Sequence, residues 1–151
     1  MSHFHTSAKG IHADLSPEER TFLGDVLPML AEIGAPGSDP AADRLQVPVY
    51  LDNPDANEEW WRLMGQELDA ARRADRSIFQ KVVSSDDEVT LSLEDADAVL
   101  RVLNQARLTL GARLGIDVED DHDNLPEDSR RVMNYLGWIQ EELTFELTRA
   151  L

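Results

Sequence analysis

One predicted helix, from Leu103 to Ile116, carries three polar side chains whose types suit the binding of an anion. Residues three and four apart share a side of an α-helix, so Arg107 falls on the apolar face of this helix. Asn104 lies on one flank of Arg107 and Arg113 on the other. The apolar face itself is marked by Leu103, Leu110 and Leu114. An arginine at that place predicts either recognition of an anionic ligand or a charge that is buried for structural reasons.

The structural alternative requires a partner for Arg107, because a buried guanidinium without one is strongly destabilising. Asp75 falls near the inner face of the preceding long helix, and Glu146 flanks the inner stripe of the last helix. Gly111, on the same flank as Asn104, would let another backbone approach closely. The usual frequency of buried ion pairs favours this alternative. We therefore predict a structural polar core made of Arg107, Asn104, Arg113, Gly111, Asp75 and Glu146.

Two further groups of residues are of metal-binding types, but neither has the required pattern. In the loop over residues 117–128, acidic side chains alternate as calcium ligands do, at Asp117, Glu119, Asp121 and Asp123. An EF-hand loop needs glycine at its sixth position and glutamate at its twelfth, where this chain has His122 and Asp128. His3 and His5 fall in a predicted mobile tail, which offers no scaffold for a selective site. The sequence therefore predicts no metal and no cofactor.

The motifs of common enzyme classes are missing from the sequence. It has no glycine-rich phosphate loop, no nucleophile elbow and no paired histidines at helical ligand spacing. It also has no cysteine, which excludes disulfides, thiolate metal sites, thiol catalysis and cysteine-based redox sensing by this chain. We therefore predict that the protein is not an enzyme.

Charge is the strongest global feature, since 30 acidic residues against 14 lysines and arginines give a net charge of −16. Such a surface repels nucleic-acid backbones and anionic membranes, so we expect direct binding to neither. The N-terminal sequence has no apolar targeting segment, which predicts a cytoplasmic protein. One basic run, which we expect to pair with the chain's own carboxylates, consists of Arg72, Arg73, Arg76 and Lys81.

Length and helix-start signals predict one helical domain over residues 11–151, after a disordered tail over residues 1–10. Ser16, Pro17 and Glu19 form a capping box at the start of the first helix. The chain of 151 residues is long enough for one core of ordinary size and too short for two.

Three longer helices follow. The sequence of the first of them predicts a feature at its middle, and that of the second predicts where it starts. The long helix after Asn53 either breaks near Asp75 or holds a polar contact there. Ser92 caps the next helix, and the last one runs from about Pro126 to the C-terminus. Short alternating segments before Ser16 and Ser92 could pair with each other. The predicted fold is mostly α, with four main helices packed as a small bundle and room for one short two-stranded sheet.

The last helix carries large apolar side chains on two sides. Its inner stripe consists of Val132, Leu136, Ile139, Leu143 and Leu147, whereas Trp138 and Phe145 lie on nearly the opposite face. Either this helix is buried on both sides, or the two aromatics form a contact patch for a protein partner or a second copy of the chain. The predicted protein-binding residues are Trp138, Phe145, Tyr135, Glu142 and Arg149.

Three segments together resemble a small actinobacterial family. The segments are EVTLSLEDADAVLRV, LNQARLTLGARLG and NYLGWIQEEL, and the resemblance extends from IHADLSPEE to the last helix. The family was long catalogued as a domain of unknown function and was later named for oxidative-stress regulation (AosR-like). The resemblance implies a cytoplasmic regulatory protein that acts through protein contacts, with transcription machinery as one candidate partner. Thiol-based sensing does not carry over to a chain without cysteine.

These observations leave three functional hypotheses. The first is a non-enzymatic regulatory or adaptor protein that binds a protein partner in a stress-response transcription pathway. The second is a small-anion-binding protein or enzyme that uses Asn104, Arg107 and Arg113. The third is a homodimer in which Trp138 and Phe145 contact a second copy.

Overall fold

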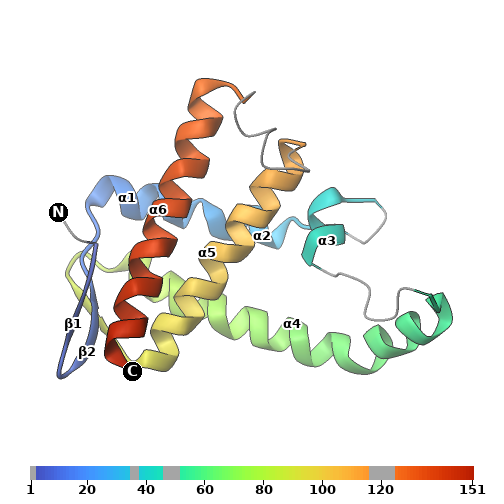
Figure 1. Ribbon diagram of the computed structural model, residues 1–151, viewed down its shortest axis with the longest axis horizontal. Coiled ribbons are helices and arrows are strands. Elements are labelled where there is room, and N and C mark those ends of the chain that lie inside the picture. Colours follow the sequence, from blue (N-terminus) through green and yellow to red (C-terminus); the bar gives the residue numbers. More distant parts are fainter. Residues whose placement is uncertain (1–2, 35–37, 46–51, 116–124) are drawn as a thin grey trace.

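The computed structural model describes residues 3–34, 38–45, 52–115 and 125–151. Within these ranges the chain forms six α-helices and three short strands (Figure 1). The strands are β1 (Phe4–Ser7), β2 (Gly10–Ala13) and β3 (Val89–Leu91). The helices are α1 (Pro17–Gly24), α2 (Val26–Ala31), α3 (Pro40–Leu45), α4 (Pro54–Ser84), α5 (Leu93–Arg113) and α6 (Glu127–Ala150). The fold is mostly α, as the sequence predicts.

Helix α5 lies at the centre of the fold. It packs against α6, α4 and α3, and Figure 1 shows α4 running past its N-terminal half toward α3. Val102, Leu103 and Ala106 on α5 are completely buried. Its small side chains let neighbouring helices approach on several sides, and the buried alanines are Ala96, Ala98, Ala106 and Ala112. The quoted stretch LNQARLTLGARLG therefore lies mostly within the packing centre of the domain.

The N-terminal residues form part of a sheet, so the prediction of a disordered tail over residues 1–10 is wrong for the part that the structure describes. Strand β1 pairs antiparallel with β2, and β2 pairs antiparallel with β3, which gives the order β1-β2-β3. Phe4 is 1% exposed and belongs to the hydrophobic core. Strand β1 has only four residues, most of them polar, so its formation depends on pairing with segments elsewhere in the chain. The sheet has three strands, where the sequence suggested two.

A glycine is required where the hairpin returns from β1. Gly10 has a φ of +138°, which side chains of L-residues rarely adopt. A Cβ atom there would lie 2.3 Å from the carbonyl oxygen of Leu91 on β3. Gly10 therefore lets β3 approach β2 closely enough to complete the sheet.

Both predicted helix caps are present. Ser16 and Glu19 form a full capping box on α1, and the Ser92 hydroxyl accepts a hydrogen bond from the Asp95 amide on α5. The first predicted helix is divided at Asp25 into α1 and α2. The division lies three residues before Pro28, which cannot donate a hydrogen bond to the preceding turn.

Helix α4 is continuous, and its middle holds the predicted polar contact. Asp75 is 7% exposed and accepts two hydrogen bonds from Arg101 on α5, each with a nitrogen–oxygen distance of 2.8 Å. The predicted partner, Arg107, is exposed, so that assignment is wrong. The reason is that Arg107 lies off the most deeply packed face of α5, which Val102, Ala106 and Thr109 form with 0% exposure.

Replacing Asp75 with asparagine should lower the free energy of unfolding by about 1–2 kcal/mol, because it weakens a paired, charge-assisted contact between α4 and α5. The matched control is Asp97→Asn, since Asp97 contacts the same guanidinium on the exposed surface. Urea denaturation followed by circular dichroism measures both variants, and the control should lose less than about 0.5 kcal/mol. Equal losses would contradict a special role for the buried carboxylate.

Candidate functional site

The residues of the predicted polar core lie at separate places. Arg107 donates to the side-chain oxygen of Gln140 on α6 at 3.2 Å, and Gln140 in turn donates to Asn104 at 3.3 Å. This chain of hydrogen bonds crosses the exposed junction of α5 and α6. Asn104 and Arg107 are therefore brought together, but by the side-chain amide of Gln140 at the surface. Neither Asp75 nor Glu146 takes part in this contact.

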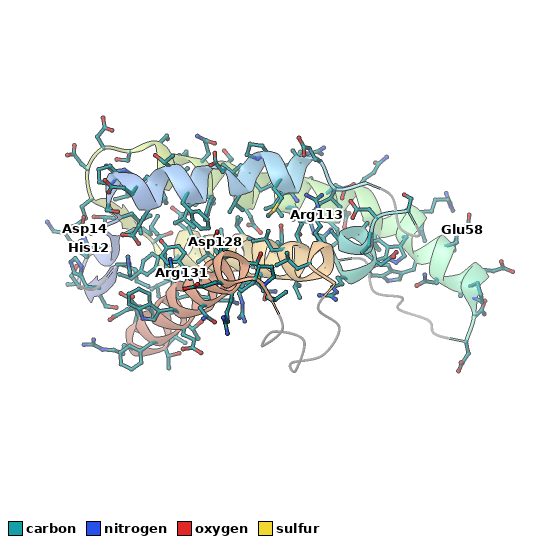
Figure 2. The ribbon with its side chains drawn as sticks, turned by 90° about the horizontal axis from the view of Figure 1, so that it is seen from above. His12, Asp14, Glu58, Arg113, Asp128 and Arg131 are labelled. Carbon is teal, nitrogen blue, oxygen red and sulfur yellow. The ribbon has the colours of Figure 1, made fainter. Side chains whose placement is uncertain are left out.

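Arg113 and Gly111 contact the region of α3. Arg113 lies 3.7 Å from the carboxylate of Asp39, and Figure 2 shows it well apart from the N-terminal sheet that carries His12. Gly111 gives the predicted close approach, but to a side chain: a Cβ atom there would lie 3.0 Å from a guanidinium nitrogen of Arg44. The three proposed anion ligands, Asn104, Arg107 and Arg113, thus do not converge on one point.

Glu146 belongs to the contact between α6 and β1. It is 7% exposed, accepts a hydrogen bond from the Thr6 hydroxyl at 2.6 Å, and lies 3.5 Å from Arg149. The predicted polar core is therefore wrong as a single cluster. Helical periodicity gave the buried acids correctly but could not say which neighbouring element each one meets.

A polar cluster that the sequence did not predict joins α1, α6 and the start of β1; its histidine is buried and its other members are half-buried. We call His3, Glu19, Tyr135 and Glu142 the N-terminal polar cluster. The His3 ring contacts Glu19 through Nε2 at 2.6 Å and Glu142 through Nδ1 at 2.9 Å. The Tyr135 hydroxyl donates to Glu19 at 2.7 Å. Because both ring nitrogens of His3 face carboxylates, the cluster anchors the start of β1 and leaves neither nitrogen for a substrate.

Backbone groups strengthen this anchor. The Glu142 carboxylate accepts the amide hydrogens of His3 at 2.5 Å and of Phe4 at 3.0 Å. It thereby covers part of the outer edge of β1, which would otherwise present unpaired donors. The sequence singled out these residues separately, Glu19 for its capping box and Tyr135 and Glu142 as protein-binding residues, but gave no signal that they meet.

The environment of Glu19 changes the proton affinity of two groups. Burial acts to raise the pKa of Glu19, but the hydrogen bonds from Tyr135 and Ser16 and the charge of His3 outweigh it and leave the pKa below its ordinary value. Burial, followed by the hydrogen bond to Glu19, raises the pKa of Tyr135 well above its ordinary value. The pair is thus a carboxylate held ionised and a phenol held protonated.

The outer face of α6 is a second candidate, and here we mean Trp138, Phe145 and Arg149. The side chains of Trp138 and Phe145 are 54% and 61% exposed, so α6 is not buried on both sides. The Arg149 guanidinium lies 5.8 Å from the centre of the Phe145 ring. The Trp138 ring meets His3 edge to face at 4.9 Å. The other two predicted binding residues turn inward and belong to the N-terminal polar cluster: Tyr135 and Glu142.

A third candidate, the arginine cleft, lies between α4 and the pair α2 and α3. Its volume is about 700 Å³, and its polar wall consists of Asp69, Arg72, Arg73, Arg76, Ser77 and Gln80. Arg72 donates to the carbonyl oxygen of Leu45 at 2.8 Å. The Nε atom of Arg76 is buried without a hydrogen-bond partner among the residues that the structure describes. Burial and the charge of Arg72 lower the pKa of Arg76.

The sequence predicted that the basic run pairs with acids of the chain, and one acid of the cleft does act on it, since the charge of Asp69 opposes the lowering of the Arg76 pKa. In the described part of the chain, Arg72 bonds a backbone carbonyl and lies near the like charge of Arg76. Two guanidinium groups close together in a chain of net charge −16 attract an anion locally.

Among the described residues, one group of metal-binding side chains lies at the N-terminal sheet. Residues 117–124 of that loop lie outside the described residues, and Asp128 is exposed in the first turn of α6. On the sheet, His5, His12 and Glu88 place one ligand atom each within 4.8 Å of the others. In the described ranges, no helix combines the length and apolar character needed to cross a membrane.

Together these features define a mostly α domain whose N-terminal hairpin is fastened to its last helix by carboxylates. A family profile described as a domain of unknown function (DUF2017) matches residues 1–147, and the chain belongs to that family. No curated protein and no solved structure matches the chain.

Replacing Glu19 with glutamine should lower the free energy of unfolding by about 1 kcal/mol at neutral pH, because the change removes the ionised acceptor but keeps a residue that completes a capping box. The folded-state pKa of Glu19 is depressed, so its stabilisation is present above its ordinary pKa of 4.5 and is lost as the pH falls through the lower folded value. Urea denaturation between about pH 3 and 7, the range in which carboxylates titrate, measures this effect. The difference in unfolding free energy between the variant and wild type should shrink as the pH falls.

The matched control is Glu18→Gln, which changes an exposed acid in the same turn of α1. This control should leave stability nearly unchanged at every pH. A difference for Glu19→Gln that is independent of pH would show that its carboxylate charge is not what stabilises the N-terminal polar cluster.

Proposed function

We propose that this protein is a non-enzymatic regulatory or adaptor protein that binds a protein partner through the outer face of α6. The observation that carries the proposal is the pair of aromatic side chains on that face. Trp138 and Phe145 are more than half exposed, while Leu136, Ile139 and Leu143 on the same helix are completely buried. An amphipathic helix has its apolar side already satisfied by the core, so two further aromatics facing solvent favour a binding surface.

The charges indicate what kind of partner would fit. The chain carries a net charge of −16, and exposed Glu141 and Thr144 separate the two aromatics. A partner surface with apolar pockets surrounded by lysine and arginine would complement this face. The same charge supports action through a protein rather than through direct contact with nucleic acid or an anionic membrane.

The family resemblance of the segments around Asn104 and Trp138 supports a finer proposal, a role in a cytoplasmic stress-response transcription pathway of the AosR-like type. Such a role would proceed without cysteine chemistry, because the chain contains no cysteine. Binding or release of the partner would then be the regulated step.

The double substitution Trp138→Ser with Phe145→Ser should abolish recovery of a specific partner while preserving the fold. The experiment compares tagged wild-type and variant chains expressed in the native host, with cross-linking before purification and mass spectrometry after it. Circular dichroism checks that the variant is folded. The matched control is Leu63→Ser, which changes an equally exposed apolar residue on α4.

Recovery of one protein by wild type and control, with loss of at least about tenfold in the double variant, is the expected result; this loss corresponds to about 1.4 kcal/mol. Equal recovery by all three chains would contradict the assignment of this face. Sedimentation over a range of concentrations tests the homodimer hypothesis, since self-association lost in the double variant would make the partner a second copy.

A second candidate function is binding of a small anion, and the arginine cleft is the observation that favours it. The sequence hypothesis used Asn104, Arg107 and Arg113, which do not converge, whereas Arg72 and Arg76 line one cleft. The unpartnered Nε–H of Arg76 is a donor that an anionic oxygen would satisfy. Phosphate or a small carboxylate has the chemistry that this wall would bind.

Inorganic phosphate should raise the melting temperature of the wild-type protein by a few degrees at millimolar concentration, by mass action on the folded state. Arg76→Met, which keeps most of the side-chain length and removes the charge, should abolish the increase. Chloride at the same ionic strength and the distant substitution Arg131→Met are the controls. An increase that persists in Arg76→Met would contradict binding in the arginine cleft.

A further inference from the structure

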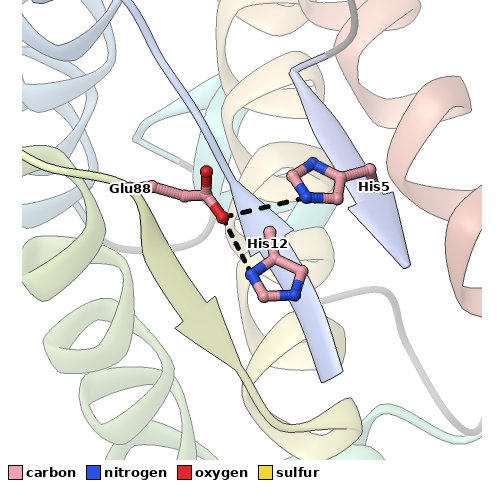
Figure 3. Close-up of side chains that lie close together, drawn as sticks. All are labelled: His5, His12 and Glu88. Carbon is pink, nitrogen blue, oxygen red and sulfur yellow. Dashed lines mark ion pairs between the residues drawn. The ribbon is translucent and has the colours of Figure 1, made fainter. Parts of the chain in front are cut away.

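The outer face of the N-terminal sheet carries two histidines and one glutamate at the same level (Figure 3). His5 on β1 and His12 on β2 are direct partners in the antiparallel register, and Glu88 immediately precedes β3. Strand alternation points Phe4 and Ile11 into the core and leaves these side chains on the opposite face. We propose that His5, His12 and Glu88 bind a divalent transition-metal ion of the zinc type.

The distances favour one common ion. The Oε1 atom of Glu88 lies 2.8 Å from Nδ1 of His12 and 3.8 Å from Nε2 of His5, and all three ligand atoms lie within 4.8 Å of one another. Zinc bonds to histidine and carboxylate at about 2.0–2.2 Å, so ligand atoms around a tetrahedral ion are roughly 3.3 Å apart. Closing the set to that spacing requires shifts of the order of 1 Å.

Exposure shows which side chains can make these shifts. The side chains of His5 and Glu88 are 52% and 43% exposed, whereas that of His12 is 13% exposed. The imidazole rings of His5 and His12 are stacked, with centres 4.5 Å apart and planes 13° from parallel. Rotation of the His5 ring, the more exposed of the two, would turn Nε2 toward the ion. His12 would stay in place as the fixed ligand.

A second contact supports the role of His12. Its Nε2 atom lies 2.6 Å from the Ser7 hydroxyl oxygen. With a metal on Nδ1, the Nε2–H group would donate to Ser7 and hold the ring in orientation, as outer hydrogen bonds do for histidine ligands. The Thr90 hydroxyl lies 3.1 Å from Nδ1 and would then be displaced to another partner.

The ligand types and surroundings define the class of ion. Two imidazoles and one carboxylate suit zinc, nickel, cobalt and copper better than calcium or magnesium, which prefer oxygen ligands. Asp86 and Asp87 precede Glu88, and the chain has a net charge of −16, so the field attracts cations. Because the site lies on an exposed face, a fourth position would remain for water or for a ligand from another molecule.

This site shares no residue with the proposed protein-binding face on α6. It would act on the N-terminal hairpin, which packs against that helix. An ion held by His5, His12 and Glu88 would tie β1 and β2 to the segment that enters β3. Metal binding would therefore stabilise the N-terminal sheet, and removal of the metal would lower the melting temperature.

The test is titration of the full-length, metal-free protein with zinc sulfate, followed by isothermal calorimetry and thermal unfolding. Wild type should bind one equivalent and gain several degrees in melting temperature. His5→Ala and Glu88→Gln, both at exposed positions, should each weaken zinc binding at least about tenfold. Glu94→Gln, an exposed carboxylate beyond β3, is the matched control and should bind as wild type does.

Cobalt substitution supplies an independent measurement, because tetrahedral cobalt with nitrogen and oxygen ligands absorbs visible light. The absorption should appear at one equivalent in wild type and in Glu94→Gln, and should be lost in His5→Ala. Absence of one-equivalent zinc binding in wild type, or equal affinity in His5→Ala, Glu88→Gln and the control, would overturn the proposal. Circular dichroism of each apo variant separates loss of a ligand from loss of the fold.

Discussion

The edge of a short N-terminal strand is the constraint on which much of this structure depends. Strand β1 has only four residues and pairs on one side with β2, so its other edge needs acceptors from elsewhere. The Glu142 carboxylate supplies them to the amides of His3 and Phe4, 139 and 138 residues away in the sequence. Glu146, one turn later on α6, accepts a hydrogen bond from the Thr6 hydroxyl. Two acids of the last helix thus fasten the first strand to the domain.

The position of His3 follows from this attachment. Once β1 lies along α6, the imidazole enters the space between α6 and α1, where Glu19 and Glu142 meet its two nitrogens. Tyr135 completes the cluster from α6, and the Trp138 ring packs edge to face against the His3 ring. The aromatic face of α6 and the N-terminal hairpin are therefore one continuous part of the molecule. A partner on that face would contact a surface whose shape the carboxylate anchor determines.

The rest of the domain is organised around α5, whose small residues allow close packing on several sides. Asp75 and Arg101 link this helix to α4 at a point where α4 would otherwise bury an unpaired carboxylate. Beyond that contact, the basic side of α4 lines the arginine cleft beside α2 and α3. In a chain with 30 acidic residues, Arg101 thus links two helices, and Arg72 and Arg76 bring positive charge together in one cleft.

The sequence by itself determined the local features of this protein. Helical periodicity and capping signals at Ser16 and Ser92 predicted the mostly α class and two helix starts, because caps and periods depend on neighbours a few residues away. It also placed Asp75 near an inner helix face and Trp138 opposite the apolar stripe of the last helix, but it left open whether Asp75 had a partner and whether Trp138 was buried. Tertiary structure decided what each of these groups meets. Arg101 rather than Arg107 reaches Asp75. His3 is held at the edge of β1 because Glu142 lies beside it, and His5 belongs to β1 because that strand pairs with β2 at His12. Such pairings depend on the relative placement of distant segments, which no local pattern of residues specifies.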